Sequence, residues 1–356
     1  MKRILYRMAT DQVNGPLAGI GIFFLWVLSC VYGAAVKRIV FFYKKGIFRR
    51  RRLHRPVISV GNLTVGGSGK TPLVMFLAQI LKDKNFKPVV LTRGYMDKGG
   101  AFSRLEGDEA AMIRRALADV PVLVGPNRFQ NAQDFLKGHA ADIFILDDGF
   151  QHWRLARDMD IVVLDAVNPW GNGCLIPRGI LREPLNALKR ADMIVVTKTN
   201  LAGGDTIQEI KTRLAVLCPD QMIVWARHHP VGLRDVRSDG AEDLSFLKGK
   251  EICSFCGIGD PASFQKILTD LGARVKEPVA FMDHYSYNNQ DIRRLVERCH
   301  ENHIDTLVTT EKDAVKLIPF LDIFDRTIRL FYLKIQIALE GDEGEFIQRI
   351  THFSQH

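Results

Sequence analysis

The chain has 356 residues, with 47% hydrophobic and 25% charged side chains, which is typical of a globular protein long enough for two domains. Its formal net charge of +9 is unevenly distributed, because residues 1–56 contain twelve Lys and Arg residues and one acidic residue, Asp11. The rest of the chain is close to neutral. This pattern excludes a broadly basic body that binds nucleic acid and indicates a basic N-terminal arm instead.

The first predicted element is a long apolar helix in this arm. No charged residue occurs from Leu17 to Val36, a length close to that needed to cross the hydrocarbon core of a membrane. A basic cluster follows at Lys37, Arg38 and residues 49–52, as expected beside the anionic lipids of a cytoplasmic membrane surface. We therefore predict that residues 1–40 form a membrane-associated helix and basic arm.

This apolar segment has three other interpretations: a signal peptide, a buried core helix and a helix that lies in the membrane interface. A signal peptide requires a small-residue cleavage site, which does not follow the segment. A buried core helix leaves the basic cluster unexplained. A helix that lies in the membrane interface stays as open as a spanning one, because Lys2, Arg3 and Arg7 put positive charge on the other flank as well.

Short apolar runs that alternate with helical patterns follow the arm and predict a doubly wound α/β domain over residues 41–226. Runs that are apolar throughout are buried on both faces, as in parallel sheets covered by helices. The expected strands are Val57–Val60, Pro88–Thr92, Ile143–Leu146, Ile161–Leu164 and Met193–Val196.

A polar, irregular stretch from Arg227 to Asp243 interrupts this pattern, and we expect a linker over residues 227–247. The alternation of strands and helices restarts after it, which predicts a smaller α/β domain over residues 248–356. Its expected elements are the strands Glu251–Cys256, Val275–Phe281 and Thr306–Thr309 and the helices Pro261–Leu271 and Asn289–Asn302.

The strongest motif is a glycine-rich loop that follows the first predicted strand and opens a predicted helix over Thr71–Lys82: Gly66, Gly67, Ser68, Gly69, Lys70 and Thr71. This context is typical of a phosphate-binding loop, in which backbone N–H groups and a helix N-terminus surround phosphate oxygens. Lys70 is expected to reach the β- and γ-phosphates of ATP, and the Thr71 hydroxyl to bind Mg²⁺. Thr64 stands where the usual pattern has its first glycine.

The predicted strand Ile143–Leu146 ends in two carboxylates, Asp147 and Asp148. An apolar strand that ends in an acidic residue downstream of a phosphate loop is the arrangement that holds Mg²⁺, directly or through water. The same residues are compatible with a strand followed by an ordinary Asp-Asp-Gly turn. The metal role therefore depends on the phosphate loop that precedes it.

Three further motifs are weaker. Thr197 to Asn200 faintly resembles a guanine-reading loop but lacks its final Asp, which favours adenine over guanine. Cys253 and Cys256 have CxxC spacing without a second pair of ligands nearby, so we expect buried strand residues. The GxGxxA pattern that begins at Gly257 is explained by Asp260 as the cap of the next helix.

Together these motifs resemble the tetraacyldisaccharide 4′-kinase family, the lipid A 4′-kinases of Gram-negative bacteria. Besides the phosphate loop, the resemblance rests on residues 93–95, 107–109, 147–152, 181–184, 283–284 and 310–313. It implies two α/β units and transfer of the γ-phosphate of ATP, with Mg²⁺, to the 4′-hydroxyl of a tetraacylated glucosamine disaccharide 1-phosphate. It also implies attachment to the inner membrane, with the catalytic domains on the cytoplasmic side.

The resemblance assigns catalytic roles to Asp108 and His284, which match the family's pair that activates the sugar hydroxyl. A carboxylate–imidazole pair can take the proton of a hydroxyl as the new bond forms. Taken without the resemblance, Asp108 is expected to cap a helix that begins at Glu109, and His284 to be a core histidine.

The resemblance also implies how the phosphates are handled. Asp147, Asp148 and Glu183 match acidic residues that hold metal and water near the phosphates. Arg128 and Arg182 match cations that neutralise charge on the transferring phosphoryl group.

Two other functions are compatible with these motifs. A P-loop GTPase switch or metallochaperone would use the loop at Thr197 and the CxxC pair, and would prefer GTP or bind a metal. A kinase that acts on a water-soluble sugar would use the apolar arm only as an anchor. Nothing in the sequence indicates an obligate protein partner.

Overall fold

The computed structural model describes residues 16–94 and 107–353, without the side chains of residues 16–18, 108 and 353. The chain divides into two compact units, each built from separate stretches. The first unit holds the chain up to Leu91, Asn127–Arg227 and the chain from Leu339 on, and the second holds Thr92–Pro126 and His228–Ala338. These units differ from the contiguous domains expected from the sequence (41–226, 227–247 and 248–356), because the chain passes from one unit to the other four times.

The first unit is built on a parallel sheet with the strand order β7-β6-β5-β1-β4-β2. Every residue of β1, β2, β4 and β6 is buried, which confirms the expectation of strands covered on both faces. The doubly wound α/β class is therefore confirmed. The strands are β1 (Val57–Asn62), β2 (Pro88–Thr92), β4 (Ile143–Asp147), β5 (Met159–Asp165), β6 (Met193–Thr197) and the start of β7 (Met222–Asp235).

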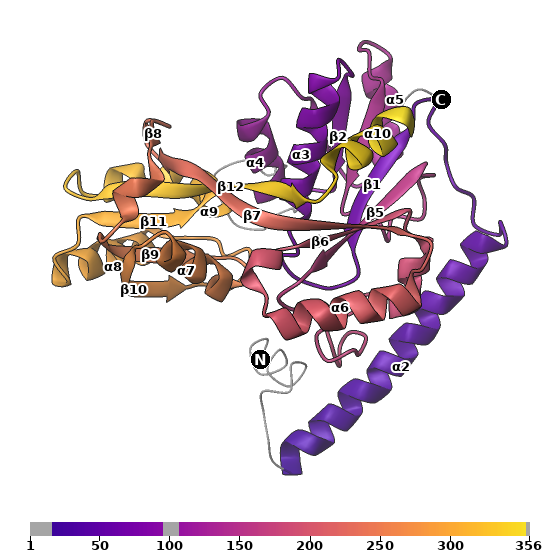
Figure 1. Ribbon diagram of the computed structural model, residues 1–356, viewed down its shortest axis with the longest axis horizontal. Coiled ribbons are helices and arrows are strands. Elements are labelled where there is room, and N and C mark those ends of the chain that lie inside the picture. Colours follow the sequence, from indigo (N-terminus) through magenta and orange to yellow (C-terminus); the bar gives the residue numbers. More distant parts are fainter. Residues whose placement is uncertain (1–15, 95–106, 354–356) are drawn as a thin grey trace. The chain divides into compact units, whose positions relative to one another are not determined.

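Helices cover both faces of this sheet (Figure 1). On one face, α3 (Lys70–Asp83) contacts β1 and β4 and packs on α10 (Glu343–Phe353). On the other face, α6 (Gly204–Leu217) and the short helix η1 (Leu185–Arg190) form a core with β5 and β6. Helix α5 (Arg128–Leu136) precedes β4. The carboxyl ends of the parallel strands share one edge of the sheet, which is where α/β proteins of this class bind ligands.

The apolar arm forms α2 (Pro16–Lys44), which is the one helix in the described part of the chain long and apolar enough to cross a membrane. One face lies against the first unit, where Ser29 donates a hydrogen bond to the carbonyl of Leu175 and Tyr32 to that of Arg182, both at 2.9 Å. The basic flank of Lys2, Arg3 and Arg7 lies outside the described residues. The other face exposes a stripe of large apolar side chains at helical spacing: Ile20, Phe23, Phe24, Val27, Leu28 and Val31.

The second unit has a parallel sheet in the order β10-β9-β11-β12, and the end of β7 lies beside β12. Buried side chains of α8, α9, β9, β11 and β12 form its core. Its strands are β9 (Glu251–Cys256), β10 (Arg274–Ala280), β11 (Thr306–Thr310), β12 (Arg329–Glu340) and the short β3 (Val122–Val124) and β8 (Ala241–Glu242). Its α-helices are α4 (Asp108–Ala116), α7 (Pro261–Asp270), α8 (Asn289–Glu301) and α9 (Glu311–Leu317).

The strands and helices expected from the sequence match the structure within two residues at each end, with one exception. The stretch expected to be irregular from Arg227 is instead part of β7, which continues to Asp235. The second half of β7 is mostly half-buried or exposed, so it carries polar residues instead of an apolar run. Pro230 also lies within it, and proline is uncommon inside strands. The sequence therefore does not show the pattern of a strand here. The sequence prediction omits several of the described elements, among them α5, α6, α9, β3, β12 and α10.

Candidate active site

The phosphate loop connects β1 to α3, as the sequence predicts. Gly66 and Gly69 have φ values of 124° and 83°, in the left-handed region that favours glycine, and Gly69 is the N-cap of α3. Asn62 at the end of β1 donates to the Ser68 hydroxyl (2.9 Å), and Thr197 at the end of β6 donates to the Ser68 carbonyl (2.8 Å). Two strand ends therefore fix the loop.

A second segment pairs with the phosphate loop and carries two of the predicted site residues. Thr64 forms an antiparallel bridge with Leu181, and the N–H of Arg182 donates to the carbonyl of Leu63 (2.6 Å). This pairing places Arg182 and Glu183 beside the loop. It also accounts for Thr64 in place of the usual glycine, because residue 64 is buried in an extended bridge where glycine has no advantage.

Lys70, Asp148 and Arg182 form the charged centre of the site. The Asp148 carboxylate accepts two hydrogen bonds from Arg182 (2.9 and 3.0 Å) and lies 3.6 Å from the Lys70 ammonium. Burial raises the pKa of Asp148, but Lys70 and Arg182 outweigh burial and hold that pKa below its usual value. Asp148 has a φ of 49°, which is uncommon for a residue with a side chain and is often found at functional sites. Gly61 of β1 allows the turn that follows Asp148 to pack closely on this strand, because a side chain at residue 61 would overlap Phe150.

Arg128 and Asp147 lie at the same edge of the sheet. Arg128 is the first residue of α5, is buried, and donates to the carbonyl of Asp147 (3.2 Å). Its guanidinium also lies 2.8 Å from Nδ1 of His152. Its charge contributes to the lowered pKa of Asp148. Three cations predicted from the sequence, Lys70, Arg128 and Arg182, are thus brought together beside the phosphate loop.

Glu183 differs from the expectation of a metal ligand. Its two carboxylate oxygens accept hydrogen bonds from Arg190 at 2.8 and 3.1 Å, and Gln151 donates to it at 3.1 Å. The Glu183 side chain is 3% exposed, so the ion pair is buried. A carboxylate with both oxygens bound by one guanidinium is suited to positioning its neighbours rather than to binding an ion.

No group of three His, Cys, Asp or Glu side chains within residues 16–94 and 107–353 could hold a metal ion by itself. A nucleotide-bound Mg²⁺ does not need such a group, because it takes one or two protein oxygens and completes its shell with phosphates and water. Thr71 in the first turn of α3, and Asp147 and Asp148 where β4 ends, offer the oxygen donors that Mg²⁺ prefers. The residues present therefore fit a nucleotide-bound Mg²⁺.

In the second unit, His284 lies in the loop between β10 and α8 and has a φ of 57°. Lys312 of α9 lies 3.2 Å from its Nε2 and 3.0 Å from the Asp283 carboxylate. Because an ammonium group only donates, Nε2 is the accepting nitrogen in this contact. Asp108 is the first residue of α4, and Gly107 rather than Asp108 is the N-cap, which corrects the capping role expected from the sequence. The Asp108 side chain lies outside the described part of the chain.

Comparison with known proteins decides the family. The model of the tetraacyldisaccharide-1-P 4′-kinase family matches residues 22–355. The chain belongs to this family. The tetraacyldisaccharide 4′-kinase of Syntrophus aciditrophicus is 42% identical over 314 residues, which cover 83% of this chain and 84% of the relative. That of Halothermothrix orenii is 37% identical over 345 residues, or 90% of each chain.

A solved structure of the family is also similar. The crystal structure of LpxK from Aquifex aeolicus in complex with ATP has a TM-score of 0.70 and 30% sequence identity, and the match covers 92% of this chain and 98% of that one. The resemblance drawn from the motifs is thereby confirmed. So is the α/β phosphate-loop fold that it implied.

Three residues that contact predicted site residues of this tetraacyldisaccharide 4′-kinase are not among the sites predicted from the sequence: Gln151 and Arg190 in the first unit, and Lys312 in the second. Gln151 and Lys312 lie inside motifs that carry the family resemblance, so a signal for them existed. Arg190 lies outside these motifs, and a lone Arg seven residues after Glu183 has no pattern that predicts an ion pair.

The cysteine pair does not support a metal-binding alternative for this family member. Cys253 and Cys256 are buried, free thiols in β9. Because side chains alternate along a strand, residues three apart point to opposite faces of the sheet and cannot bind one ion together. Burial also raises the pKa of Cys256 to about 12, which keeps its thiol protonated.

The expected cap of α7 is confirmed, since Asp260 accepts from the N–H of Ser263 (3.1 Å).

Proposed function

We propose that this chain is a kinase that transfers the γ-phosphate of ATP to the 4′-hydroxyl of a tetraacyldisaccharide 1-phosphate in lipid A biosynthesis. The observation that carries the proposal is the set of three cations around Asp148 beside a phosphate loop, in a chain of the tetraacyldisaccharide 4′-kinase family. The Aquifex aeolicus relative, whose crystal structure contains ATP, supports ATP as the phosphate donor.

The phosphate loop and its cations bind and stabilise the triphosphate in this proposal. Lys70 and Arg182 exchange their contacts with Asp148 for contacts with phosphate oxygens, and Arg128 adds a third positive charge. Charge-assisted hydrogen bonds from these groups stabilise the negative charge on the transferring and leaving phosphates. Bound Mg²⁺, held by Thr71 and the carboxylates where β4 ends, supplies further charge neutralisation on the phosphates.

His284 takes the proton of the attacking hydroxyl in this proposal. The 4′-oxygen forms a bond to the γ-phosphorus while the bond from that phosphorus to the bridging oxygen of ADP breaks, and the hydroxyl proton passes to Nε2 of His284. The contact with Lys312 holds the imidazole in place until the substrate hydroxyl replaces the ammonium at Nε2. Asp108 serves as the carboxylate of the pair, and Glu183, bound by Arg190, positions the segment that carries Arg182.

We further infer that α2 lies in the membrane surface rather than across it. Ser29 and Tyr32, in the middle of the helix, are hydrogen-bonded to backbone carbonyls of the first unit. A spanning helix would carry these carbonyls and their loop into hydrocarbon, where exposed backbone is costly. The apolar stripe on the other face fits a helix that lies in the interface, and the basic residues at its end fit the cytoplasmic face of the inner membrane.

The test is transfer of phosphate from labelled ATP to an acylated glucosamine disaccharide 1-phosphate in detergent. Wild-type protein is expected to form the 4′-phosphorylated product, whereas Lys70→Ala, Asp108→Ala and His284→Ala lose most of the transfer and keep cooperative unfolding. Hydrolysis of ATP or GTP without transfer would overturn the proposal in favour of a nucleotide switch. Full activity on a deacylated disaccharide would replace the lipid substrate with a water-soluble sugar.

A further inference from the structure

A basic pocket of about 750 Å³ opens in the first unit where α2 ends. Asp160 is the one acidic residue in its lining, and its carboxylate already pairs with Arg157 at 3.1 Å. The pocket therefore presents a surplus of positive charge to any ligand that enters it. Five basic residues line it: Lys44, Arg49, Arg50, Arg157 and Arg190.

Aromatic side chains hold several of these cations in place. Trp153 is buried and stacks on Tyr43, with 5.9 Å between the ring centroids. The guanidinium groups of Arg50, Arg157 and Arg190 lie 5.2, 5.5 and 4.4 Å from the centre of the Trp153 ring. Cation–π contacts stabilise each position, but three cations around one indole also repel one another. An anion bound among them relieves this repulsion.

The pocket combines fixed and available cations. Arg157 donates to backbone carbonyls and Arg190 to a carboxylate, so the fold holds both of them. Within the described residues, no acidic side chain pairs with Lys44, Arg49 or Arg50. Burial lowers the pKa of Arg157, and the nearby charges of Arg190 and Arg50 lower it further. Lys44, Arg49 and Arg50 can bind a ligand because no acidic side chain in the part of the chain that the structure describes competes for them.

The pocket is separate from the phosphate loop and borders the membrane helix. Asp160 and Arg190 lie where β5 and β6 begin, whereas the phosphate loop follows the end of β1. Beginnings and ends of parallel strands lie at opposite edges of a sheet. Phe48 in the pocket lining is 42% exposed, and Phe41, near the end of α2, is 51% exposed. A cationic pocket next to exposed apolar side chains matches the phosphate and the hydrocarbon of a membrane lipid.

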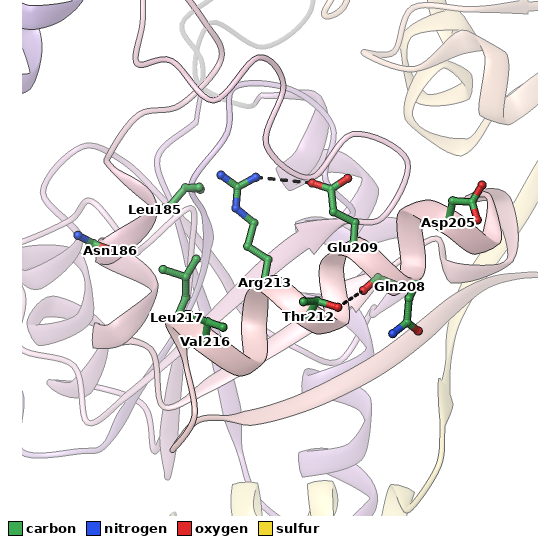
Figure 2. Close-up of a pocket in the computed structure, with 9 residues that line it drawn as sticks. All are labelled: Leu185, Asn186, Asp205, Gln208, Glu209, Thr212, Arg213, Val216 and Leu217. Atoms are coloured by element: carbon green, nitrogen blue, oxygen red, sulfur yellow. Dashed lines mark hydrogen bonds and ion pairs between the residues drawn. The ribbon is translucent and has the colours of Figure 1, made fainter.

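Charge rather than size distinguishes this pocket from another hollow in the same unit. A hollow of about 780 Å³ on α6 is lined by Asp205 and Glu209 as well as by Arg213. Arg213 pairs with Glu209 at 3.6 Å, and Figure 2 shows this pair above the apolar side chains of Val216 and Leu217. The charged residues of this hollow leave no surplus positive charge for an anion.

From these observations we infer that the basic pocket binds the phosphate headgroup of an anionic phospholipid of the membrane. The ligand class is a glycerophospholipid with a net negative headgroup, such as phosphatidylglycerol. Lys44, Arg49 and Arg50 contact its phosphate, and its acyl chains lie beside Phe41 and Phe48. The residues that contact the phosphate lie outside the kinase site, which the pocket meets at Arg190, and the inference does not depend on the substrate proposed above.

Binding is measured on the full chain with dihexanoyl phosphatidylglycerol below its micelle-forming concentration, by tryptophan fluorescence. Arg49→Gln/Arg50→Gln is expected to weaken binding about tenfold, since both side chains face the anionic headgroup. The matched control Lys45→Gln/Arg55→Gln removes the same charge from exposed residues outside the pocket and is expected to bind like wild type. Trp153→Phe is expected to remove the signal, and a signal that survives it places the lipid elsewhere and overturns the inference.

The source of the anion is decided by competing ligands. Dihexanoyl phosphatidylcholine, inorganic phosphate and glucosamine 1-phosphate are expected not to saturate the pocket. Saturation by glucosamine 1-phosphate without binding of phosphatidylglycerol assigns the pocket to a sugar phosphate and overturns the inference, as does equal binding of inorganic phosphate. With vesicles of phosphatidylcholine and phosphatidylglycerol in equal amounts, the pocket variant is expected to lose more binding than the control. Equal losses in both variants also overturn it.

Discussion

Arg190 binds both carboxylate oxygens of Glu183, at 2.8 and 3.1 Å. The same guanidinium stacks on Phe150 at 4.1 Å from the ring centre, in the turn that follows Asp148. Glu183 directly follows Arg182, which binds Asp148. The buried ion pair therefore supports both partners of the central contact of the site.

Replacing Arg190 with Gln tests this support. The Glu183 carboxylate is left buried without its charge partner, which typically costs about 3–5 kcal/mol of folding free energy. Denaturant unfolding should show this loss, and phosphate transfer should fall because Arg182 is less well held. The double variant Arg190→Gln/Glu183→Gln should recover most of the stability. A loss below about 1 kcal/mol in the single variant would contradict the prediction, since it matches an exposed ion pair.

Replacing Asp148 with Asn should separate nucleotide binding from transfer. The carboxylate competes with phosphate for Lys70 and Arg182, so without Mg²⁺ the variant should bind ATP about tenfold more tightly. With Mg²⁺, transfer should fall by about two orders of magnitude. Calorimetry with ATP in the presence of a chelator checks the first effect, and the transfer assay checks the second. Weaker ATP binding in the chelator would show that Asp148 does not compete with phosphate.

The stability contributed by Asp148 should depend on pH in a defined direction. Its pKa lies below the usual value of about 3.9. A carboxyl group with a lowered pKa stabilises the fold above its unfolded-state pKa, and the stabilisation is lost as the pH falls through the folded-state pKa. The difference in unfolding free energy between wild type and Asp148→Asn should be constant from about pH 8 to about pH 5 and shrink only below about pH 4. Denaturant titrations across this range measure it, and a difference that already shrinks above pH 5 disagrees with a lowered pKa.

Lys312 should act through the orientation of His284 and not through ATP. Lys312→Met keeps the aliphatic stem but removes the ammonium that contacts Nε2 of His284 and the Asp283 carboxylate. We expect kcat to fall about tenfold with the KM for ATP unchanged. Lys312→Arg, which can still donate to both groups, should recover part of the rate. A change in the KM for ATP with kcat unchanged would place Lys312 in nucleotide binding instead.

The exposed stripe of α2 should carry membrane attachment. Each large apolar side chain buried in the membrane contributes about 1.5–3 kcal/mol, so Phe24→Ser/Val27→Ser/Val31→Ser should leave most of the protein off vesicles. The control Ser29→Ala/Tyr32→Phe removes only the hydrogen bonds of the docked face and should leave attachment unchanged. Vesicle flotation measures both. Loss of attachment in the control alone would reverse the roles of the two faces.

The phosphate-binding part of the site could be predicted from the sequence because its signals are local. The glycine loop ending in Thr71 and the apolar strand ending in Asp147 each specify an element and its chemistry within a few residues. The role of Glu183 could not be predicted in the same way. A carboxylate in that position suits a metal or an ion pair equally, and its partner Arg190 is set by the turn of η1 rather than by a motif.

The division of the chain into two units built from separate stretches could not be predicted from the sequence either. Hydrophobic periodicity indicates that a strand exists, but not which sheet the chain enters next. Residues 92–126 leave the first unit at the end of β2, and in the sequence the polar stretch that follows is no different from an ordinary loop within one domain. In β7, the half-buried positions carry polar residues and Pro230 follows them, so the sequence looks like the end of a strand where the strand in fact continues.

Order along the sequence and order in space differ in the first unit. α2 precedes and α10 follows every other described helix and strand, yet both belong to this unit. Phe346 of α10 is fully buried and packs on Phe76 of α3, the helix that begins at the phosphate loop. The packing of the helix that begins at the phosphate loop therefore depends on a segment that lies far from it in the sequence. A change in α10 can weaken nucleotide binding without touching the loop itself.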